Sequence, residues 1–150
     1  MHCSESGIEL IKHFEGLRLT AYVCIGGKPT IGYGSTFYED GSEVNLGDVI
    51  TLQRANELLM NILSQFERDV STLLHGIPVN QNQFDALVSF AFNLGTESLA
   101  QSTLLNKVKS NHNDTSIAYE FGRWVRAGGQ RINGLVIRRR KEAELYFTVA

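Results

Sequence analysis

The sequence predicts an α+β fold in which a small β region near the N-terminus precedes a larger helical region. β-Branched and aromatic residues between glycines gather within residues 15–50, whereas apolar residues at helical spacing dominate residues 51–150. We expect one domain of 150 residues, with a β lobe over about 15–50 and a helical lobe over about 51–150 that includes an N-terminal helix. A cleft between two lobes is the natural place for a ligand site.

The N-terminal third changes from helix to strand signals. Residues 4–14 place apolar side chains at helical spacing after a capping serine, Ser4 or Ser6, and Gly16 is suited to end that helix. The segments LTAYVCI and PTIGYGST predict a hairpin over GGK, and residues 37–50 are polar and rich in turn residues.

A long amphipathic helix is predicted over residues 51–74, with Thr51 as its N-cap, and it is long enough to join two lobes. Asp114 is expected to cap a later helix that Gly128-Gly129 ends. The shorter helices are predicted over 81–93 and near 98–109, 115–127 and 135–147.

Charge is distributed unevenly along the chain. The formal net charge is −2, yet residues 121–141 contain seven Lys or Arg and no acidic residue. Such a segment is either a solvated helix face or a patch that attracts a polyanion such as nucleic acid or cell wall. We expect no nucleic-acid partner, because no recognised module is present and aromatic residues do not interleave with the charges.

The two cysteines, Cys3 and Cys24, form neither a disulfide framework nor a metal-ligand spacing. No apolar run reaches about 18 residues, so we expect no stable insertion into a membrane. The first residues lack the hydrophobic region of a signal peptide. Either the chain is made without an export signal, or such a segment lies upstream.

Glu15 is a candidate general acid. It falls in the last turn of the first predicted helix, where the negative end of the helix dipole disfavours a carboxylate. A carboxyl group that stays protonated near neutral pH can donate a proton in catalysis. The alternative is a surface glutamate paired with Lys12 or Arg18.

Cys24 and Thr30 flank the Gly-Gly turn, and the loop length decides whether they meet. A two-residue turn puts them on opposite faces, whereas a three-residue loop sets Cys24 directly across from Thr30, with Cβ atoms about 5 Å apart. If they act together, we expect the longer loop or an equivalent bulge. Otherwise Cys24 is a small buried apolar side chain and Thr30 an ordinary strand residue.

The spacing of Glu15, Cys24 and Thr30 resembles the Glu-x8-(Asp or Cys)-x5-Thr pattern of the phage-type, T4 lysozyme-like muramidases, many of which are phage endolysins. Cys24 stands where an aspartate is usual, and Ser35 stands where the family usually has a histidine, at a position that looks structural. Further segments are similar to the family in the same order and cover nearly the whole chain: FEGLRLTAY, PTIGYGST, QFDALVSFAFNLG, STLLNKV, WVRAGG and GLVIRRRKEAELY.

The resemblance implies a lysozyme-like fold, with a small N-terminal β lobe and a larger helical lobe joined by a long helix. It implies hydrolysis of the β-1,4 bond between N-acetylmuramic acid and N-acetylglucosamine in peptidoglycan, without metal or cofactor. The implied partner is the glycan strand, and the implied state is a monomer. Synthesis in the bacterial host cytoplasm and action in the periplasm or cell wall are expected.

The resemblance also implies residue roles. Glu15 would protonate the glycosidic oxygen, and Thr30 would hold the attacking water. The residue at Cys24 would stabilise the oxocarbenium-like transition state or activate water, which a thiol does well only as a thiolate. The implied substrate-binding residues are Gly32, Tyr33, Asn93 and Arg138.

Two other functions stay open: a peptidoglycan-binding module that lost activity through Cys24, and an antibacterial effector domain with the same chemistry. A Cys3–Cys24 disulfide would occupy a site residue and switch an enzyme off until it is reduced. In a reducing compartment both thiols would instead be free.

Overall fold

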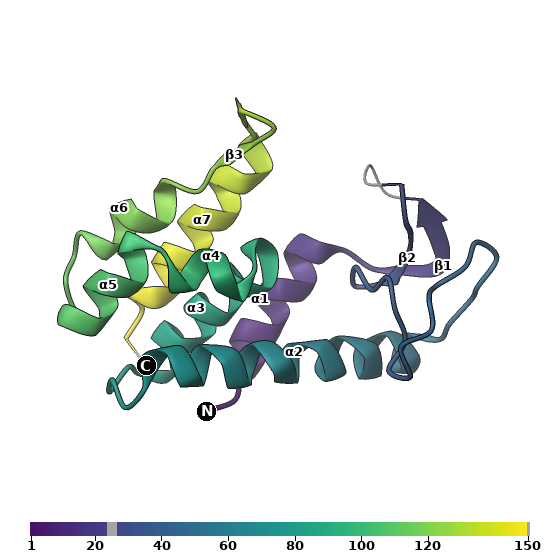
Figure 1. The fold of residues 1–150 in the computed structure, drawn as a ribbon, viewed down its shortest axis with the longest axis horizontal. Coiled ribbons are helices and arrows are strands. Elements are labelled where there is room, and N and C mark those ends of the chain that lie inside the picture. The colour runs from purple at the N-terminus through teal and green to yellow at the C-terminus, as the bar shows by residue number, and fades with distance from the viewer. Residues whose placement is uncertain (24–26, 150) are drawn as a thin grey trace. The chain divides into compact units, whose positions relative to one another are not determined.

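The computed structural model describes residues 1–23 and 27–149. The chain divides into two compact units. We call them the helical unit, Met1–Ile8 with Phe66–Ala150, and the β unit, Glu9–Gln65. Two helices pass from one unit into the other, α1 (Glu5–Glu15) and α2 (Leu52–Leu74) (Figure 1). Among the described residues, none of the helices combines the length and the apolar character needed to cross a bilayer.

Helix α1 forms where it was predicted. Gly16 ends it: its φ is +72°, and its N–H donates to the Lys12 carbonyl at 3.0 Å, a conformation that glycine adopts without strain. At the other end, the Asp85 carboxylate accepts hydrogen bonds from the Ser4 N–H at 3.1 Å and from the Ser4 hydroxyl. A carboxylate at a helix N-terminus is favoured by the helix dipole.

Gly7 permits this contact, because a Cβ at position 7 would lie 2.7 Å from Asp85 Cγ. We expect Gly7→Ala to lower the free energy of unfolding by about 1–3 kcal/mol through overpacking, although alanine is the better helix former. The matched control is Gly134→Ala in α7 (Asn133–Tyr146), where nothing lies within 4 Å of the added methyl group. Urea denaturation of both variants measures the effect, and equal stabilities would contradict the prediction.

Strands β1 (Arg18–Val23) and β2 (Pro29–Gly32) form an antiparallel pair in the β unit, but in neither of the two registers that the sequence left open. Thr30 lies opposite Tyr22. A three-residue loop would instead have placed Thr30 opposite Cys24, a residue that lies outside the described residues. A local hydrogen bond contributes to this outcome, because the Thr30 hydroxyl donates to the carbonyl two residues earlier, at 3.1 Å. Such local bonds compete with ladder pairing and favour a longer turn.

The segment after β2 folds back through isolated bridges rather than regular strands. Ser35 is 2% exposed and exchanges two backbone hydrogen bonds with Ile31, each of 2.9 Å, so its position is a structural one. Thr51 caps α2, as predicted, by accepting from the Arg54 N–H at 3.1 Å. One hydrophobic cluster in the core of this unit contains Ile31, Val44 and Leu58, with Ala21, Tyr38 and Ile50 packed against it.

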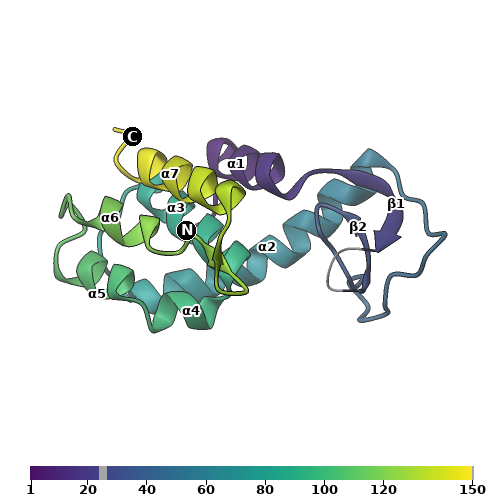
Figure 2. The ribbon, with the colours of Figure 1, turned by 90° about the horizontal axis from the view of Figure 1, so that it is seen from above.

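Helix α3 (Gln81–Leu94) is the buried centre of the helical unit. Asn80 caps it in a reciprocal capping box with Gln83, and Gly95, with φ +97°, ends it. Helix α7 packs along α3, as Figures 1 and 2 both show. The remaining helices are α4 (Thr96–Ala100), α5 (Thr103–Ser110) and α6 (Ile117–Gly122).

The helix predicted near 98–109 is two helices instead of one. Its interruption falls at Ser102, whose side chain accepts from the Leu105 N–H at 3.0 Å. A serine that caps a new helix satisfies an N–H that would otherwise lack a partner, so the chain restarts α5 there.

The helix predicted near 115–127 is also shorter than expected and ends at Gly122. Gly128 and Gly129 do not end a helix but form the turn of a hairpin. Their φ values of +59° and +79° are those of the two-residue turns that suit the twist of paired strands. The hairpin consists of β3 (Arg126–Ala127) and β4 (Gln130–Arg131).

Candidate active site

Glu15 lies beside the turn that follows β2. Its Oε1 atom is 3.3 Å from the place that a Cβ on Gly34 would occupy, and Gly34 has φ +92°. A side chain at position 34 would therefore both crowd the carboxylate and strain the backbone. The glycine lets the backbone of this turn approach the half-buried Glu15 carboxyl group closely.

The residues just before this turn are mostly buried. Gly32 packs against Ile50 and Ala55, whose nearest atoms lie 3.6 Å from the position of an added Cβ. Tyr33 is 8% exposed, and the Lys12 ammonium lies 5.4 Å from the centroid of its ring, a cation–π contact. What these two candidate substrate-binding residues offer a ligand is therefore chiefly backbone.

Thr30 is buried, with 4% of its surface exposed. Its hydroxyl hydrogen is used in the bond to the Lys28 carbonyl, so the hydroxyl oxygen keeps its capacity to accept. The third candidate catalytic residue, Cys24, lies outside the described residues. Its catalytic role therefore stays a prediction.

A groove of about 360 Å³ in the β unit begins at Gly34 and runs along α2. Asn61 and Gln65 line it one helical turn apart, together with the apolar Leu58. Sequence reasoning missed these two amides, although their spacing within the amphipathic pattern of residues 51–74 was a usable signal. Among the described residues, no group of three or more His, Cys, Asp or Glu side chains is placed to hold a metal ion.

The outer wall of this groove is held by a paired carboxylate. Arg54 donates to both oxygens of Glu39, at 2.5 and 2.6 Å, and these bonds keep the pKa of Glu39 below its usual value. Glu39 lines the groove, whereas Arg54 comes from α2. The bidentate pair thus ties the loop that forms one wall to the helix that forms the other.

A second carboxylate, Asp48, holds the same loop. It accepts from the Asn45 N–H at 3.0 Å and from the Tyr38 hydroxyl at 2.6 Å, and both bonds lower its pKa. We expect Tyr38→Phe to move the pKa of Asp48 back up, toward its ordinary 3.8. Carbon-13 NMR titration of the carboxyl group measures the shift, and Tyr22→Phe is the control because it leaves Asp48 untouched.

The sign of the accompanying stability change follows from linkage. Because the folded-state pKa of Asp48 lies below its unfolded value of 3.8, the ionised group contributes stability above that pH. The contribution is lost as the pH falls through the folded pKa. Tyr38→Phe should therefore lose less stability than the wild type on acidification from neutral pH to below about pH 3. An unchanged pKa and an unchanged acid dependence would contradict the assignment.

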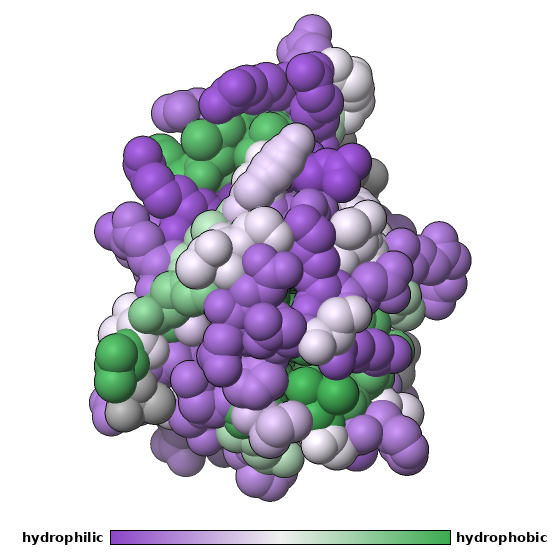
Figure 3. Space-filling model, turned by 90° about the vertical axis from the view of Figure 1, so that its left-hand side faces the viewer, coloured by the Kyte–Doolittle hydropathy of each residue, from purple (hydrophilic) through white to green (hydrophobic). Residues whose placement is uncertain are grey.

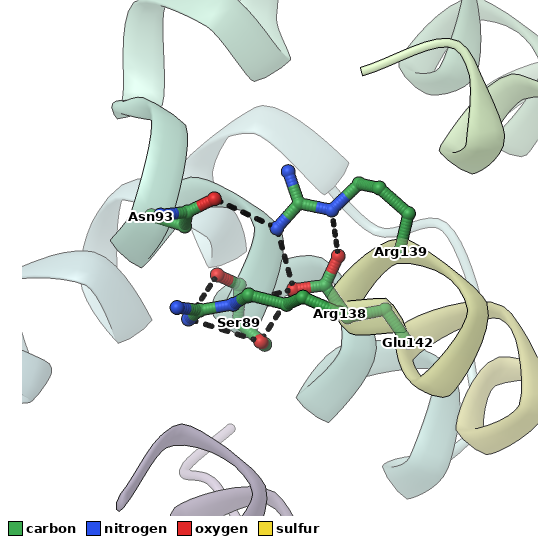
Figure 4. A network of polar contacts seen from close by, with 5 residues as sticks. All are labelled: Ser89, Asn93, Arg138, Arg139 and Glu142. Carbon is green, nitrogen blue, oxygen red and sulfur yellow. Dashed lines mark hydrogen bonds and ion pairs between the residues drawn. The ribbon is translucent and has the colours of Figure 1, made fainter. Parts of the chain in front are cut away.

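Asn93 and Arg138, the candidate substrate residues of the helical unit, belong to a buried ion cluster (Figure 4). Arg138 is 4% exposed; its Nη2 donates to the Ser89 carbonyl at 3.2 Å, and its Nε lies 3.4 Å from Glu142 Oε2. Arg139 is 1% exposed and donates to Asn93 Oδ1 at 2.9 Å. Its Nε forms an ion pair of 2.8 Å with Glu142 Oε1, without hydrogen-bond geometry. The Asn93 amide is thus held in a fixed orientation.

The basic segment 121–141 is therefore not one surface: Arg138 and Arg139 are buried, whereas its other five basic residues are exposed. Arg138 and Arg139 are buried because Glu142, one turn further along the same helix, faces them. Burial raises the pKa of Glu142, while the two guanidinium groups and the Ser89 hydroxyl act in the opposite direction.

Cys3 is a free thiol in the helical unit, and burial, followed by the charges of Asp85 and Glu67, raises its pKa. A thiol that stays protonated is a poor nucleophile in disulfide exchange. The environment of Cys3 thus favours a free thiol over the Cys3–Cys24 disulfide switch, and Cys24 itself lies outside the described residues.

Comparisons with known proteins agree with this arrangement. The phage lysozyme family model matches residues 12–142. The endolysin of Bacillus phage B103 is 43% identical over 150 residues, which are 99% of this chain and 55% of that protein. The endolysin of Salmonella phage P22 is 40% identical, with 99% of both chains covered. The solved endolysin of Escherichia coli O157:H7 phage FAHEc1 is 36% identical, has a TM-score of 0.90, and is matched over 98% of this chain and 94% of its own.

The chain therefore belongs to the phage lysozyme family. It has the α+β lysozyme fold and contains the lysozyme-type glycoside hydrolase domain of that family. It spans only about half the length of the Bacillus phage relative, at 55%, but almost all of the Salmonella phage one, at 99%.

Proposed function

We propose that the chain hydrolyses the β-1,4 bond between N-acetylmuramic acid and N-acetylglucosamine in peptidoglycan, and so contributes to bacterial lysis. The observation that carries this proposal is the position of Glu15 at the end of α1, against Gly34, where the groove of the β unit begins. The family membership supports the choice of substrate. The chain would be made in the host cytoplasm and act on the cell wall as a monomer.

Glu15 would donate its proton to the glycosidic oxygen as the bond to the muramic acid carbon breaks. General acid catalysis of this kind contributes roughly 10²–10⁴ in rate. The Thr30 hydroxyl gives its own hydrogen to the Lys28 carbonyl, which leaves its oxygen to accept from the attacking water and to orient it. Cys24 would assist as a thiolate, as base or nucleophile, and this role rests on sequence spacing alone.

The groove offers the two kinds of contact that a glycan needs. Phe37 and Ile62 supply apolar surface for the faces of sugar rings, while Asn61 and Gln65 supply amides for the N-acetyl groups. The backbone of Gly32 and Tyr33 would add further contacts in the β unit. In the helical unit, the oriented amide of Asn93 would be available to a glycan strand. Arg138 would support the glycan site mainly through the ion cluster, since it is 4% exposed.

The products of digestion test this proposal. Purified peptidoglycan is incubated with the protein, and the soluble fragments are reduced with borohydride and identified by mass spectrometry. We expect reduced N-acetylmuramic acid at the new chain ends. Reduced N-acetylglucosamine would assign cleavage to the other glycosidic bond, and binding to the walls without soluble fragments would point to a non-catalytic binding module. Cys24→Ala, tested in parallel, reports whether the thiol contributes to the rate.

A further inference from the structure

The helical unit contains a second cavity, of about 560 Å³, between α6 and α7. Small side chains on the two helices leave this hollow: Ala118 and Gly122 on α6, and Ala143 on α7. Figure 3 shows the left-hand side of Figure 1, the side of α6, where green apolar surface lies among purple hydrophilic residues near the top. The volume of the cavity is within the range of pockets that hold small ligands.

The rim of this cavity carries an excess of positive charge. Arg131 and Arg140 line it, both are exposed, and neither has an ion-pair partner among the residues described. The one lining carboxylate, Glu144, already pairs with Lys141 at 3.4 Å. Two guanidinium groups therefore remain at the edge of an apolar hollow without an anion, and guanidinium is the side-chain group best matched to a carboxylate.

Arg139 adds a third positive charge, from a buried position in the cavity wall. It also lines the cavity, and although it is 1% exposed, its Nη1 has no hydrogen-bond partner within residues 1–23 and 27–149. Figure 4 shows this nitrogen pointing away from both Glu142 and Asn93. Positive charge that is not fully neutralised in a desolvated setting strengthens the attraction for an anion nearby.

We propose that this cavity binds an apolar carboxylate, with the hydrocarbon body against the walls of α6 and α7 and the carboxylate at Arg131 and Arg140. Neither half of such a ligand suffices alone. Exposed ion pairs contribute little in water, and a purely apolar molecule leaves the guanidinium groups without a partner. The proposal does not depend on the proposed hydrolase activity, because it involves none of the residues assigned to catalysis.

The ligand chemistry is tested on the nitrogen-15-labelled chain by NMR titration with octanoate, octanamide and acetate. We expect octanoate to shift amide signals of α6 and α7, with affinity at least about tenfold above that of the other two. Equal binding of octanamide, or the absence of any shift, would overturn the proposal. N-acetyl-Leu-Leu serves as a second carboxylate probe. If it binds more tightly than octanoate, the natural ligand is a peptide C-terminus. If it binds more weakly, the natural ligand is a fatty acid.

Three variants test the location. Ala143→Leu fills the hollow and Arg140→Gln removes one guanidinium group, so each should weaken octanoate binding about tenfold or more. Arg126→Gln is the matched control, because this exposed hairpin arginine does not line the cavity. In each variant, the amide signals of residues away from the cavity should keep their wild-type positions, which shows that the variant is folded. If Arg126→Gln weakens binding as much as Arg140→Gln, general surface charge holds the anion and the assigned site is wrong.

Discussion

Replacing Glu15 by glutamine is expected to abolish cell-wall hydrolysis almost completely, with a loss of about 10³-fold in the initial rate. Glutamine has the size of glutamate and can still lie against Gly34, but its amide protons are not acidic enough to protonate the leaving oxygen. The free energy of unfolding should change by less than about 1 kcal/mol, because Glu15 is half-buried at the end of its helix. A turbidity assay on purified walls measures the rate, and a urea titration measures the stability.

The matched control for this experiment is Glu9→Gln. Glu9 lies on the same helix, is exposed, and forms a long ion pair of 3.8 Å with Lys12. We expect this variant to clear walls at the wild-type rate. Glu15→Asp keeps the acid but shortens its reach, so an intermediate rate would show that position matters as well as chemistry. A fully active Glu15→Gln variant would refute the role of Glu15 as the proton donor.

Glu142→Gln is expected to lower the free energy of unfolding by about 3–5 kcal/mol. The glutamine side chain fills the same space but carries no charge, so the buried Arg139 guanidinium loses the carboxylate that lies 2.8 Å from it. A desolvated charge without its counterion costs far more than an exposed ion pair contributes. Urea denaturation followed by the fluorescence of Trp124, the one tryptophan of the chain, measures the loss.

Glu144→Gln provides the control, since it lies two positions further along α7 and is exposed. Its pair with Lys141, at 3.4 Å, is a surface pair, and its removal should cost less than about 0.5 kcal/mol. If Glu142→Gln were no more damaging than Glu144→Gln, the cluster would not be a stabilising element. The double variant Glu142→Leu with Arg139→Met should recover part of the loss, because apolar residues of similar volume can replace a buried ion pair.

Three of the helix ends were predictable from single residues. Gly16 and Gly95 end α1 and α3, and Thr51 caps α2, because each acts on backbone groups within four positions of itself. The candidate proton donor was likewise recognisable, since its place at a helix end before a glycine is a local feature. The same kind of reasoning failed at Gly128-Gly129, because two adjacent glycines are as well suited to a hairpin turn as to a helix end.

Contacts between distant positions were not predictable in this way. Nothing near Ser4 shows that Asp85 will bind the start of α1, or that Gly7 must stay small for it. Nor does the run of arginines at 138–140 show which two are buried. Their pairing with Glu142 is visible as a helical spacing, but only packing of α7 on α3, with Ser89 facing Glu142 at 2.5 Å, removes that cluster from water.

By itself, therefore, the sequence determined the fold class, the helix ends at Gly16, Thr51 and Gly95, the family pattern and the choice of a candidate proton donor, because each is encoded by neighbours along the chain. The tertiary structure alone decided the strand register at Thr30, the burial of Arg138 and Arg139, and the two cavities. These depend on which surfaces lose water when segments far apart in sequence pack together, and burial of that kind has no local signal.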